Sequence, residues 1–236
     1  MVNIAFTGGG TGGHIYPGLA VAACLGRMGD FRIFWIGSSA GMDRSIVEGR
    51  GLEFYGIPSG RLRRYFSLKT IPDMFRVLGG FFAARSLLKK LKPALLFSKG
   101  GFVSVPPCAA AASLGIPVFT HESDFSPGLA TRINLRFAAR TGGRIFTAYD
   151  DTASFFAPPY RRLVSVSGNP VRAEFRNADP AKGRAFLGLG EGDRILLVLG
   201  GSQGAKELNR LVREALPELT KLFVVVHQTG ARNEWD

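Results

Sequence analysis

Two glycine-rich segments each follow a short apolar run and precede a stretch with helical periodicity. The first extends from Gly9 to His14 after the run 2–7, and the second extends from Gly200 to Ala205 after the run 194–199. Glycine lets the backbone turn sharply and lets its N–H groups approach a ligand without a Cβ in the way. A helix N-terminus behind such a turn favours a phosphate or pyrophosphate. Because this arrangement occurs once in each half, the sequence predicts two nucleotide-binding-type domains.

Short apolar runs alternate with segments that have the spacing of amphipathic helices. Most of the runs are continuously apolar, which is typical of strands covered on both faces. This alternation predicts the α/β class, with doubly wound parallel sheets. The predicted strands are 2–7, 31–37, 52–57, 94–98, 116–120, 144–147, 162–167, 194–199 and 222–227, and the predicted helices include 17–28, 41–49, 127–140 and 205–219.

A domain boundary is predicted at the segment Gly168–Arg172, where an Asn-Pro pair forms a rigid turn. The first domain would comprise residues 1–168 and the second would start at 169 and run to 236. Only two predicted strands follow the boundary, and two strands rarely form an independent sheet. We therefore expect this chain to be the front part of a longer protein, with its second domain incomplete.

Composition narrows the class of protein. The chain has 236 residues, of which 46% are hydrophobic, enough for a sizeable core. Its start has no charged n-region or long h-region, so no secretory signal is predicted, and no run reaches the roughly 18–20 apolar residues that span a bilayer. The only cysteines, Cys24 and Cys108, fit a reducing compartment better than a disulfide framework or a metal site. A cytoplasmic location is expected.

The formal net charge of +12 is unevenly distributed, because nine basic residues and one acidic residue, Asp73, lie between Arg61 and Lys92. Such a segment needs an anionic partner, either nucleic acid, an anionic lipid surface or a phosphorylated substrate. Within it, 70–91 carries apolar side chains on more than one helical stripe. Two interpretations remain open: a core helix with a basic rim, or a helix that inserts side chains into a bilayer surface. The inserted side chains would be Met74, Val77 and Phe81 or Phe82.

The first glycine loop permits two other nucleotide interpretations. Gly8, Gly10 and Gly13 satisfy the dinucleotide pattern G-x-G-x-x-G, but an NAD site expects an acidic residue at the end of the second strand, which here ends in 37–39, Gly-Ser-Ser. A P-loop is excluded because no Gly-Lys-Ser/Thr closes either loop. An NAD-dependent oxidoreductase therefore remains only a disfavoured alternative.

Three further features are candidates for chemistry. His14 would lie beside a bound phosphate and accept a proton, or would only cap the helix and orient the loop. His121 and Glu122 are expected just after the strand 116–120, where they would bind a sugar hydroxyl, orient a base or form a structural hydrogen-bond network. The turn 99–104 would offer N–H groups to the same anion as the first loop, or would be an ordinary connection. No metal site is predicted, because His227 is remote in sequence and no other ligand pair has suitable spacing.

Several of these segments together resemble one family. The sequence is similar to the MurG family, the bacterial UDP-N-acetylglucosamine–N-acetylmuramyl-(pentapeptide) pyrophosphoryl-undecaprenol N-acetylglucosamine transferases, from residue 3 to about residue 230. The motifs that carry the resemblance occur in the same order as in that family: 9–20 (GGTGGHIYPGLA), 100–104 (GGFVS), 121–124 (HESD), 127–129 (PGL), 168–172 (GNPVR) and 200–205 (GGSQGA).

The resemblance implies a GT-B glycosyltransferase with two Rossmann-like domains, the second incomplete here. It would move N-acetylglucosamine from UDP-GlcNAc to lipid I with inversion, giving lipid II in peptidoglycan synthesis, and would need no metal or other cofactor. Residues 1–168 would bind the acceptor, and 169–236 would begin the donor-binding domain. The enzyme would be peripheral, at the cytoplasmic face of the bacterial cell membrane, with an anionic membrane surface but no nucleic acid as a partner.

The resemblance also implies residue roles. His14 becomes the favoured general base, and Glu122 is a second catalytic candidate. The loops 9–13 and 100–104 would hold the acceptor diphosphate, and the helix start would touch the donor. The predicted substrate-binding residues are Thr11, Gly12, Gly13, Gly100, Gly101, Ser104, His121, Asp124, Arg172, Ser202 and Gln203, of which Arg172 and Ser202 would contact the UDP portion.

The sequence departs from the family pattern at three points. Asp124 stands where many members have Asn, and an ionised carboxylate accepts but does not donate hydrogen bonds. Phe102 stands where Tyr is usual, and it lacks the hydroxyl. The family's main uracil, ribose and sugar contacts lie in the later part of the second domain, which this chain lacks. We therefore expect the chain alone to be inactive, as a fragment that binds a membrane and a lipid diphosphate.

Overall fold

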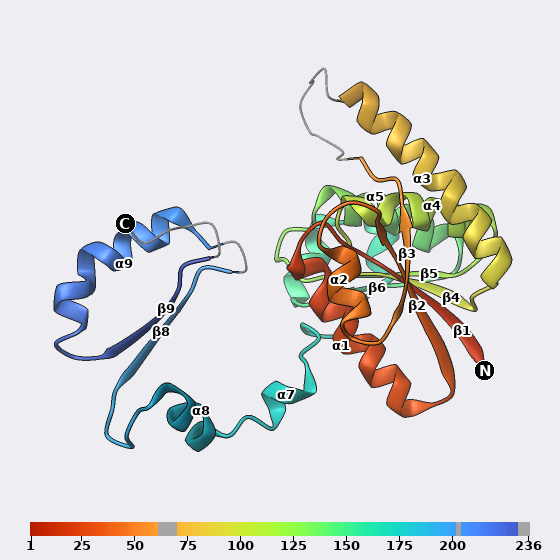
Figure 1. Ribbon diagram of the computed structural model, residues 1–236. Coiled ribbons are helices and arrows are strands. Elements are labelled where there is room, and N and C mark those ends of the chain that lie inside the picture. The colour runs from red at the N-terminus through yellow and green to blue at the C-terminus, as the bar shows by residue number, and fades with distance from the viewer. Residues whose placement is uncertain (61–69, 202–203, 231–236) are drawn as a thin grey trace. The chain divides into compact units, whose positions relative to one another are not determined.

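A computed structural model describes residues 1–60, 70–201 and 204–230, without the side chains of 70–72. The chain divides into two compact units, Met1–Ala173 and Glu174–Asp236 (Figure 1). The division falls a few residues after position 168, where the sequence predicts the first domain to end.

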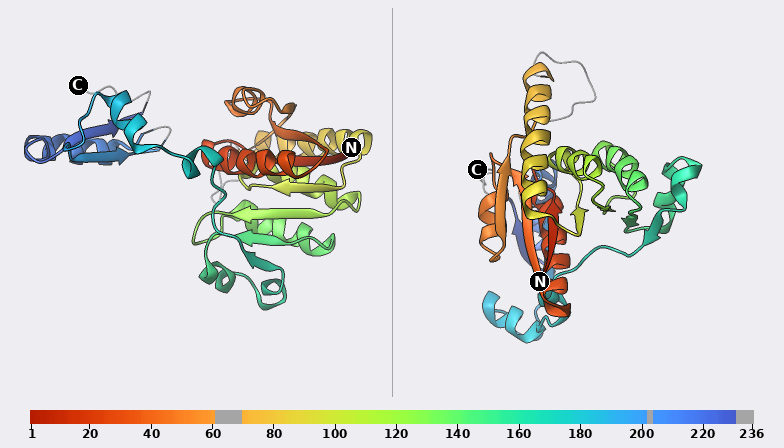
Figure 2. Two further views of the ribbon diagram at one scale, coloured as in Figure 1. Left: turned by 90° about the horizontal axis from the view of Figure 1, so that it is seen from below. Right: turned by 90° about the vertical axis from the view of Figure 1, so that its right-hand side faces the viewer.

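Unit 1 is built on one sheet of seven strands in the order β3-β2-β1-β4-β5-β6-β7, with every neighbouring pair parallel. The left-hand view of Figure 2 shows these strands side by side. All seven predicted strands of this region are confirmed. Their bounds are β1 Val2–Thr7, β2 Phe31–Ser38, β3 Glu53–Ile57, β4 Leu95–Ser98, β5 Val118–Glu122, β6 Ile145–Thr147 and β7 Val164–Val166.

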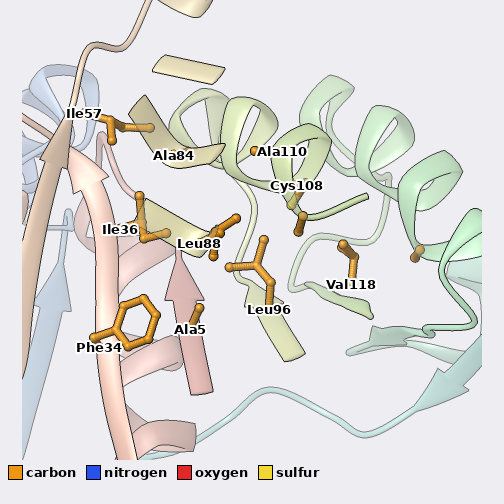
Figure 3. Packing of buried hydrophobic residues seen from close by; sticks show 12 residues of the cluster. Ala5, Phe34, Ile36, Ile57, Ala84, Leu88, Leu96, Cys108, Ala110 and Val118 are labelled. Atoms are coloured by element: carbon orange, nitrogen blue, oxygen red, sulfur yellow. The ribbon is translucent and has the colours of Figure 1, made fainter. Parts of the chain in front are cut away.

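Helices cover both faces of this sheet, which explains why its strands are continuously apolar. Strand side chains alternate between the faces, and each set meets different helices. One set, including Phe6 and Trp35, packs against α1 (Gly12–Met28) and α2 (Asp43–Glu48). The other, including Phe34 and Leu96, packs against α3 (Thr70–Leu91), α4 (Val105–Ser113) and α5 (Leu129–Arg140), as Figure 3 shows. The predicted doubly wound architecture is thereby confirmed.

The strand order reverses direction at β1, which has β2 on one side and β4 on the other. The chain leaves β1 towards the α1 face of the sheet and leaves β4, through the 3₁₀ turn Phe102–Ser104, towards the α4 face. Connections that diverge in this way open a crevice at the carboxyl ends of the strands, and ligands of open α/β sheets bind there. Both glycine-rich loops of unit 1 lie at this switch point.

Helix α3 has a buried side and an exposed apolar stripe. Ala84 and Leu88 are fully buried, and Phe81 packs against the same core. Phe81 and the half-buried Val77 are therefore not the exposed side chains that the membrane hypothesis expected. The exposed apolar side chains of the helix are instead Met74 (63% exposed), Phe75 (70%), Leu78 (52%) and Phe82 (60%).

The rest of unit 1 connects β6 to β7. The 3₁₀ helix Asp150–Phe155 and α6 (Pro158–Arg161) lie between β6 and β7. Phe156 packs there against Leu135 and Ile145 in a small separate cluster.

Unit 2 repeats the strand–helix–strand pattern on a smaller scale. After α7 (Ala173–Arg176) and α8 (Pro180–Leu187), β8 (Ile195–Leu199) leads through α9 (Lys206–Leu219) to β9 (Val224–Gln228). The two strands pair in parallel, with Ile195 opposite Val224. The sequence predicts both strands, so all nine predicted strands are present.

Candidate functional site

The two glycine loops of unit 1 lie against each other at the switch point. A Cβ placed on Gly101 would lie 2.7 Å from the carbonyl oxygen of Gly9, and one placed on Gly10 would lie 2.5 Å from the ring of Phe102. Gly10, Gly100 and Gly101 also have φ angles of 85°, 83° and 78°, which side-chain-bearing residues rarely adopt. Glycine is therefore needed at Gly10 and Gly101 for both conformation and close approach, and at Gly100 for conformation.

Two buried side chains, those of Asp43 and Trp35, form hydrogen bonds with the backbone of the first loop. Asp43 accepts a hydrogen bond from the Gly10 N–H through Oδ1 and another from the Ser38 N–H through Oδ2, both at 3.0 Å. The indole Nε1–H of Trp35 donates to the Gly8 carbonyl, also at 3.0 Å. The amide of Gly10 is therefore engaged within the protein and does not face a ligand.

The helix start offers the anion-binding groups of this loop. Helix α1 begins at Gly12, and the amides of a first helical turn have no acceptor within the helix. Thr11 precedes the helix with an extended backbone, and its side chain makes no capping hydrogen bond. The N–H groups of Gly12 and Gly13 are thus directed to whatever lies in front of the helix, where the helix dipole favours an anion.

His14 links the two loops. Its Nδ1 lies 3.3 Å from the carbonyl oxygen of Lys99, and its backbone N–H donates to the Thr11 carbonyl at 3.1 Å. A carbonyl oxygen only accepts, so Nδ1 carries the hydrogen and Nε2 of the neutral ring is left as the basic nitrogen. The ring is half-buried in the first turn of α1.

The electrostatic surroundings keep His14 neutral. Burial lowers the pKa of His14, and the nearby ammonium of Lys99 lowers it further. The hydrogen bond to the Lys99 carbonyl and the carboxylates of Glu122 and Asp124 oppose this with smaller effects. At neutral pH the imidazole is thus free to accept a proton, as a general base requires.

Hydrogen bonds of buried side chains fix the conformation of the second loop. Ser104 is fully buried, and its hydroxyl donates to the Gly101 carbonyl at 2.8 Å while accepting from the Asn134 side chain at 2.8 Å. The Gly100 N–H donates to the Ser98 hydroxyl at 3.2 Å. The geometry therefore gives Ser104, predicted to bind substrate, an internal role in shaping the loop.

His121 and Glu122 are the last two residues of β5, so the prediction that they follow the strand is wrong. The pairing continues because they lie opposite Phe146 and Thr147 of β6. His121 is buried and donates from Nε2 to the Gly168 carbonyl at 3.0 Å, which leaves its buried Nδ1 without a partner in the described part of the chain. Burial lowers the pKa of His121.

Glu122 holds the loop that follows β5. Its Oε1 accepts from the Asp124 N–H and its Oε2 from the Gly128 N–H, both at 3.0 Å. Both carboxylate oxygens are thus engaged with the backbone, as the structural-network interpretation expected. The Asp124 side chain is exposed.

The remaining predicted site residues lie at the end of unit 1 or beyond it. The Arg172 guanidinium lies over the ring of Tyr16, 5.5 Å from its centroid, so the segment after β7 returns to α1. Ser202 and Gln203 lie outside the described residues. Among the residues that are described, no group of three or more His, Cys, Asp or Glu side chains is arranged to hold a metal ion.

Sequence reasoning missed three residues of this site: Trp35, Asp43 and Lys99. Trp35 and Asp43 act on glycines that are distant in sequence, and no local pattern indicates such contacts. Lys99 did leave a signal, because a lysine directly between a buried strand and a Gly-Gly pair must place its charge at the carboxyl edge of the sheet.

The parallel seven-stranded sheet, covered by helices on both faces, is a Rossmann-like domain of the GT-B class. The chain belongs to glycosyltransferase family 28: residues 4–142 match the N-terminal domain of that family and residues 195–236 match its C-terminal domain. This membership removes the basis for the oxidoreductase alternative.

Two curated relatives and one solved structure illustrate the similarity. The UDP-N-acetylglucosamine–N-acetylmuramyl-(pentapeptide) pyrophosphoryl-undecaprenol N-acetylglucosamine transferase of Treponema denticola is 53% identical over 99% of this chain and 61% of its own length. That of Treponema pallidum strain Nichols is 52% identical over 98% of this chain and 59% of its own length. The crystal structure of Acinetobacter baumannii MurG matches with a TM-score of 0.67 and 27% identity, covering 98% of this chain and 60% of that one. The resemblance to the MurG family is confirmed, and the chain spans about three fifths of these relatives.

Proposed function

We propose that this chain supplies the acceptor-binding domain, 1–168, and the start of the donor-binding domain, 169–236, of an enzyme that transfers N-acetylglucosamine from UDP-GlcNAc to lipid I. The observation that carries the proposal is the pair of loops at the switch point. Gly12 and Gly13 offer amides at a helix N-terminus, the Gly100–Gly101 turn packs beside them, and His14 joins the two. A diphosphate fits such a site because its charge meets the helix dipole and backbone N–H groups.

The reaction is a single displacement. The acceptor hydroxyl attacks the anomeric carbon of N-acetylglucosamine, the bond from that carbon to the UDP oxygen breaks, and UDP leaves with the electron pair. His14 Nε2 takes the proton from the attacking hydroxyl. Attack from the face opposite UDP inverts the anomeric centre.

The other predicted residues position the neighbouring loop or contact the substrates. Glu122 acts as a positioning residue that holds the 123–128 loop, where Asp124 is exposed to an incoming substrate. Following the family resemblance, we assign Thr11, His121, Arg172, Ser202 and Gln203 to substrate contacts.

A sugar-transfer assay tests the proposal. The chain is assayed alone and after completion with the remaining C-terminal part of the Treponema denticola relative, using radiolabelled UDP-GlcNAc and lipid I. We expect labelled lipid II from the completed protein and none from the chain alone, which would then act as a lipid-diphosphate-binding fragment. Absence of transfer by the completed protein, with intact folding, would refute the proposed function.

The acceptor is a membrane lipid, and we propose that α3 docks unit 1 on the anionic inner-membrane surface at the cytoplasmic face. No helix among the described residues is long and apolar enough to cross a membrane. The exposed stripe of α3 repeats at Met74, Leu78 and Phe82, with Phe75 beside it, and the exposed Lys89 and Lys90 follow. Apolar insertion combined with basic headgroup contacts is how interfacial helices bind anionic membranes.

Replacing both Phe75 and Phe82 by serine is expected to weaken binding to phosphatidylglycerol-containing vesicles about tenfold or more, since burying one such side chain contributes about 1.5–3 kcal/mol. Vesicle co-sedimentation measures this. Phe186→Ser is the matched control, because Phe186 lies in unit 2 and is 89% exposed. Equal binding by the double variant and the unchanged chain would contradict membrane docking through α3.

A further inference from the structure

Lys99 is a buried lysine whose ammonium has no ion-pair partner in the described part of the chain. The residue is only 2% exposed and ranks among the largest fully buried side chains. Its backbone is fixed at both ends, because its N–H donates to the Thr7 carbonyl at 2.8 Å and its carbonyl accepts from His14. Burying an unpaired charge is costly, so this residue requires an explanation that packing does not supply.

The Lys99 side chain lies on the α1 face of the sheet, at the switch point itself. A Cβ placed on Gly8 or on Gly18 would lie 3.2 Å or 3.6 Å from the Lys99 Cβ, so the side chain starts between the first glycine loop and α1. Its positive charge lowers the pKa values of His14 and His121, so both rings lie within electrostatic range of the ammonium. The carboxylates of Glu122 and Asp124 also interact electrostatically with Lys99. Burial lowers the pKa of Lys99, whereas these two carboxylates raise it.

We propose that Lys99 is the fixed positive charge of the diphosphate subsite and contacts a phosphate oxygen of the ligand held between the two glycine loops. The inference rests on the proposed function, but names a residue that the glycine-loop argument does not require. A charge-assisted contact adds to the amide contacts of the helix start. It also links binding to catalysis, because a phosphate that neutralises Lys99 relieves the effect that lowers the pKa of His14, and His14 then becomes a stronger base when the acceptor is present.

The test compares Lys99→Met with Lys99→Arg and with Arg27→Met. Arg27 is exposed in the last turn of α1, which leads into the start of β2, so this control removes a positive charge from the opposite edge of the sheet. Calorimetry measures binding of geranyl diphosphate, inorganic pyrophosphate and UDP to the chain. We expect Lys99→Met to weaken diphosphate binding about tenfold or more, with Lys99→Arg and Arg27→Met close to the unchanged chain. A loss confined to geranyl diphosphate would assign the subsite to the lipid acceptor, and a loss confined to UDP would assign it to the donor.

Two further readouts separate this role from a structural one. Proton NMR should show that the pKa of His14 rises in Lys99→Met, because a nearby positive charge is removed. The thermal unfolding midpoint should stay equal or rise, since methionine fills similar space without a buried charge. Unchanged binding, an unchanged His14 pKa or a lower unfolding midpoint in Lys99→Met would overturn the role of Lys99 alone. If the unchanged chain binds none of the three diphosphates, both this inference and the proposed acceptor site fail.

Discussion

Replacing His14 by alanine is expected to lower kcat for N-acetylglucosamine transfer by the completed protein about 10²–10⁴-fold, the usual contribution of a general base. The KM for UDP-GlcNAc should change little, because the ring acts on the acceptor hydroxyl. His14→Gln is the matched variant, since its amide N–H is able to donate to the Lys99 carbonyl but it has no basic nitrogen. Transfer at near-normal rate by His14→Gln would show that the residue only orients the loops.

The pH dependence of the rate is a second test of His14 as the general base. The base is active when neutral, so kcat/KM should fall as the pH drops through the pKa of His14. Because burial and Lys99 lower that pKa, the fall should occur below 6.5, the ordinary value for histidine. The rate should be flat from there through neutral pH. A fall centred above 6.5 would contradict the electrostatic surroundings described for this ring.

Replacing Trp35 by alanine is expected to destabilise unit 1 by about 3–5 kcal/mol, the usual loss for a large aromatic core residue. Trp35 is fully buried, its ring centroid lies 5.8 Å from that of Phe6, and it occupies the space that a side chain on Gly18 would need. Urea unfolding of the chain measures the loss.

Trp35→Phe separates packing from the hydrogen bond to the first loop. It keeps an aromatic ring but leaves the Gly8 carbonyl without its donor, which should cost about 1 kcal/mol. It should also weaken diphosphate binding, because the first glycine loop loses the hydrogen bond that fixes the Gly8 carbonyl. If Trp35→Phe were as unstable as Trp35→Ala, the hydrogen bond and not the packed ring would dominate at this position.

The strands and their parallel arrangement were predictable because burial on both faces leaves a direct record in the sequence, as in the run Phe31–Ile36. The five glycines between positions 8 and 13 likewise predicted the position of the first loop. The end of β5 was less predictable. His121 and Glu122 are polar, so the apolar pattern stops before them, but hydrogen bonding to β6 continues through both.

The inner structure of the site was not predictable because it depends on contacts between distant residues. Asp43 lies 33 residues from Gly10, and Trp35 lies 27 residues from Gly8. No local spacing relates these pairs before the sheet is formed. The same applies to the surroundings of Ser104, a residue that the family resemblance assigns to substrate binding: the packing of α5 brings the Asn134 side chain to its hydroxyl.

Amide NMR shifts of the chain during titration with geranyl diphosphate test the central claim most directly, namely that the switch-point loops of unit 1 hold a diphosphate. We expect the largest shifts at Gly12, Gly13 and Gly101, with smaller effects at Gly10 and Gly100, whose N–H groups donate to Asp43 and to Ser98. Shifts that leave these loops unchanged, or that are confined to unit 2, would contradict it.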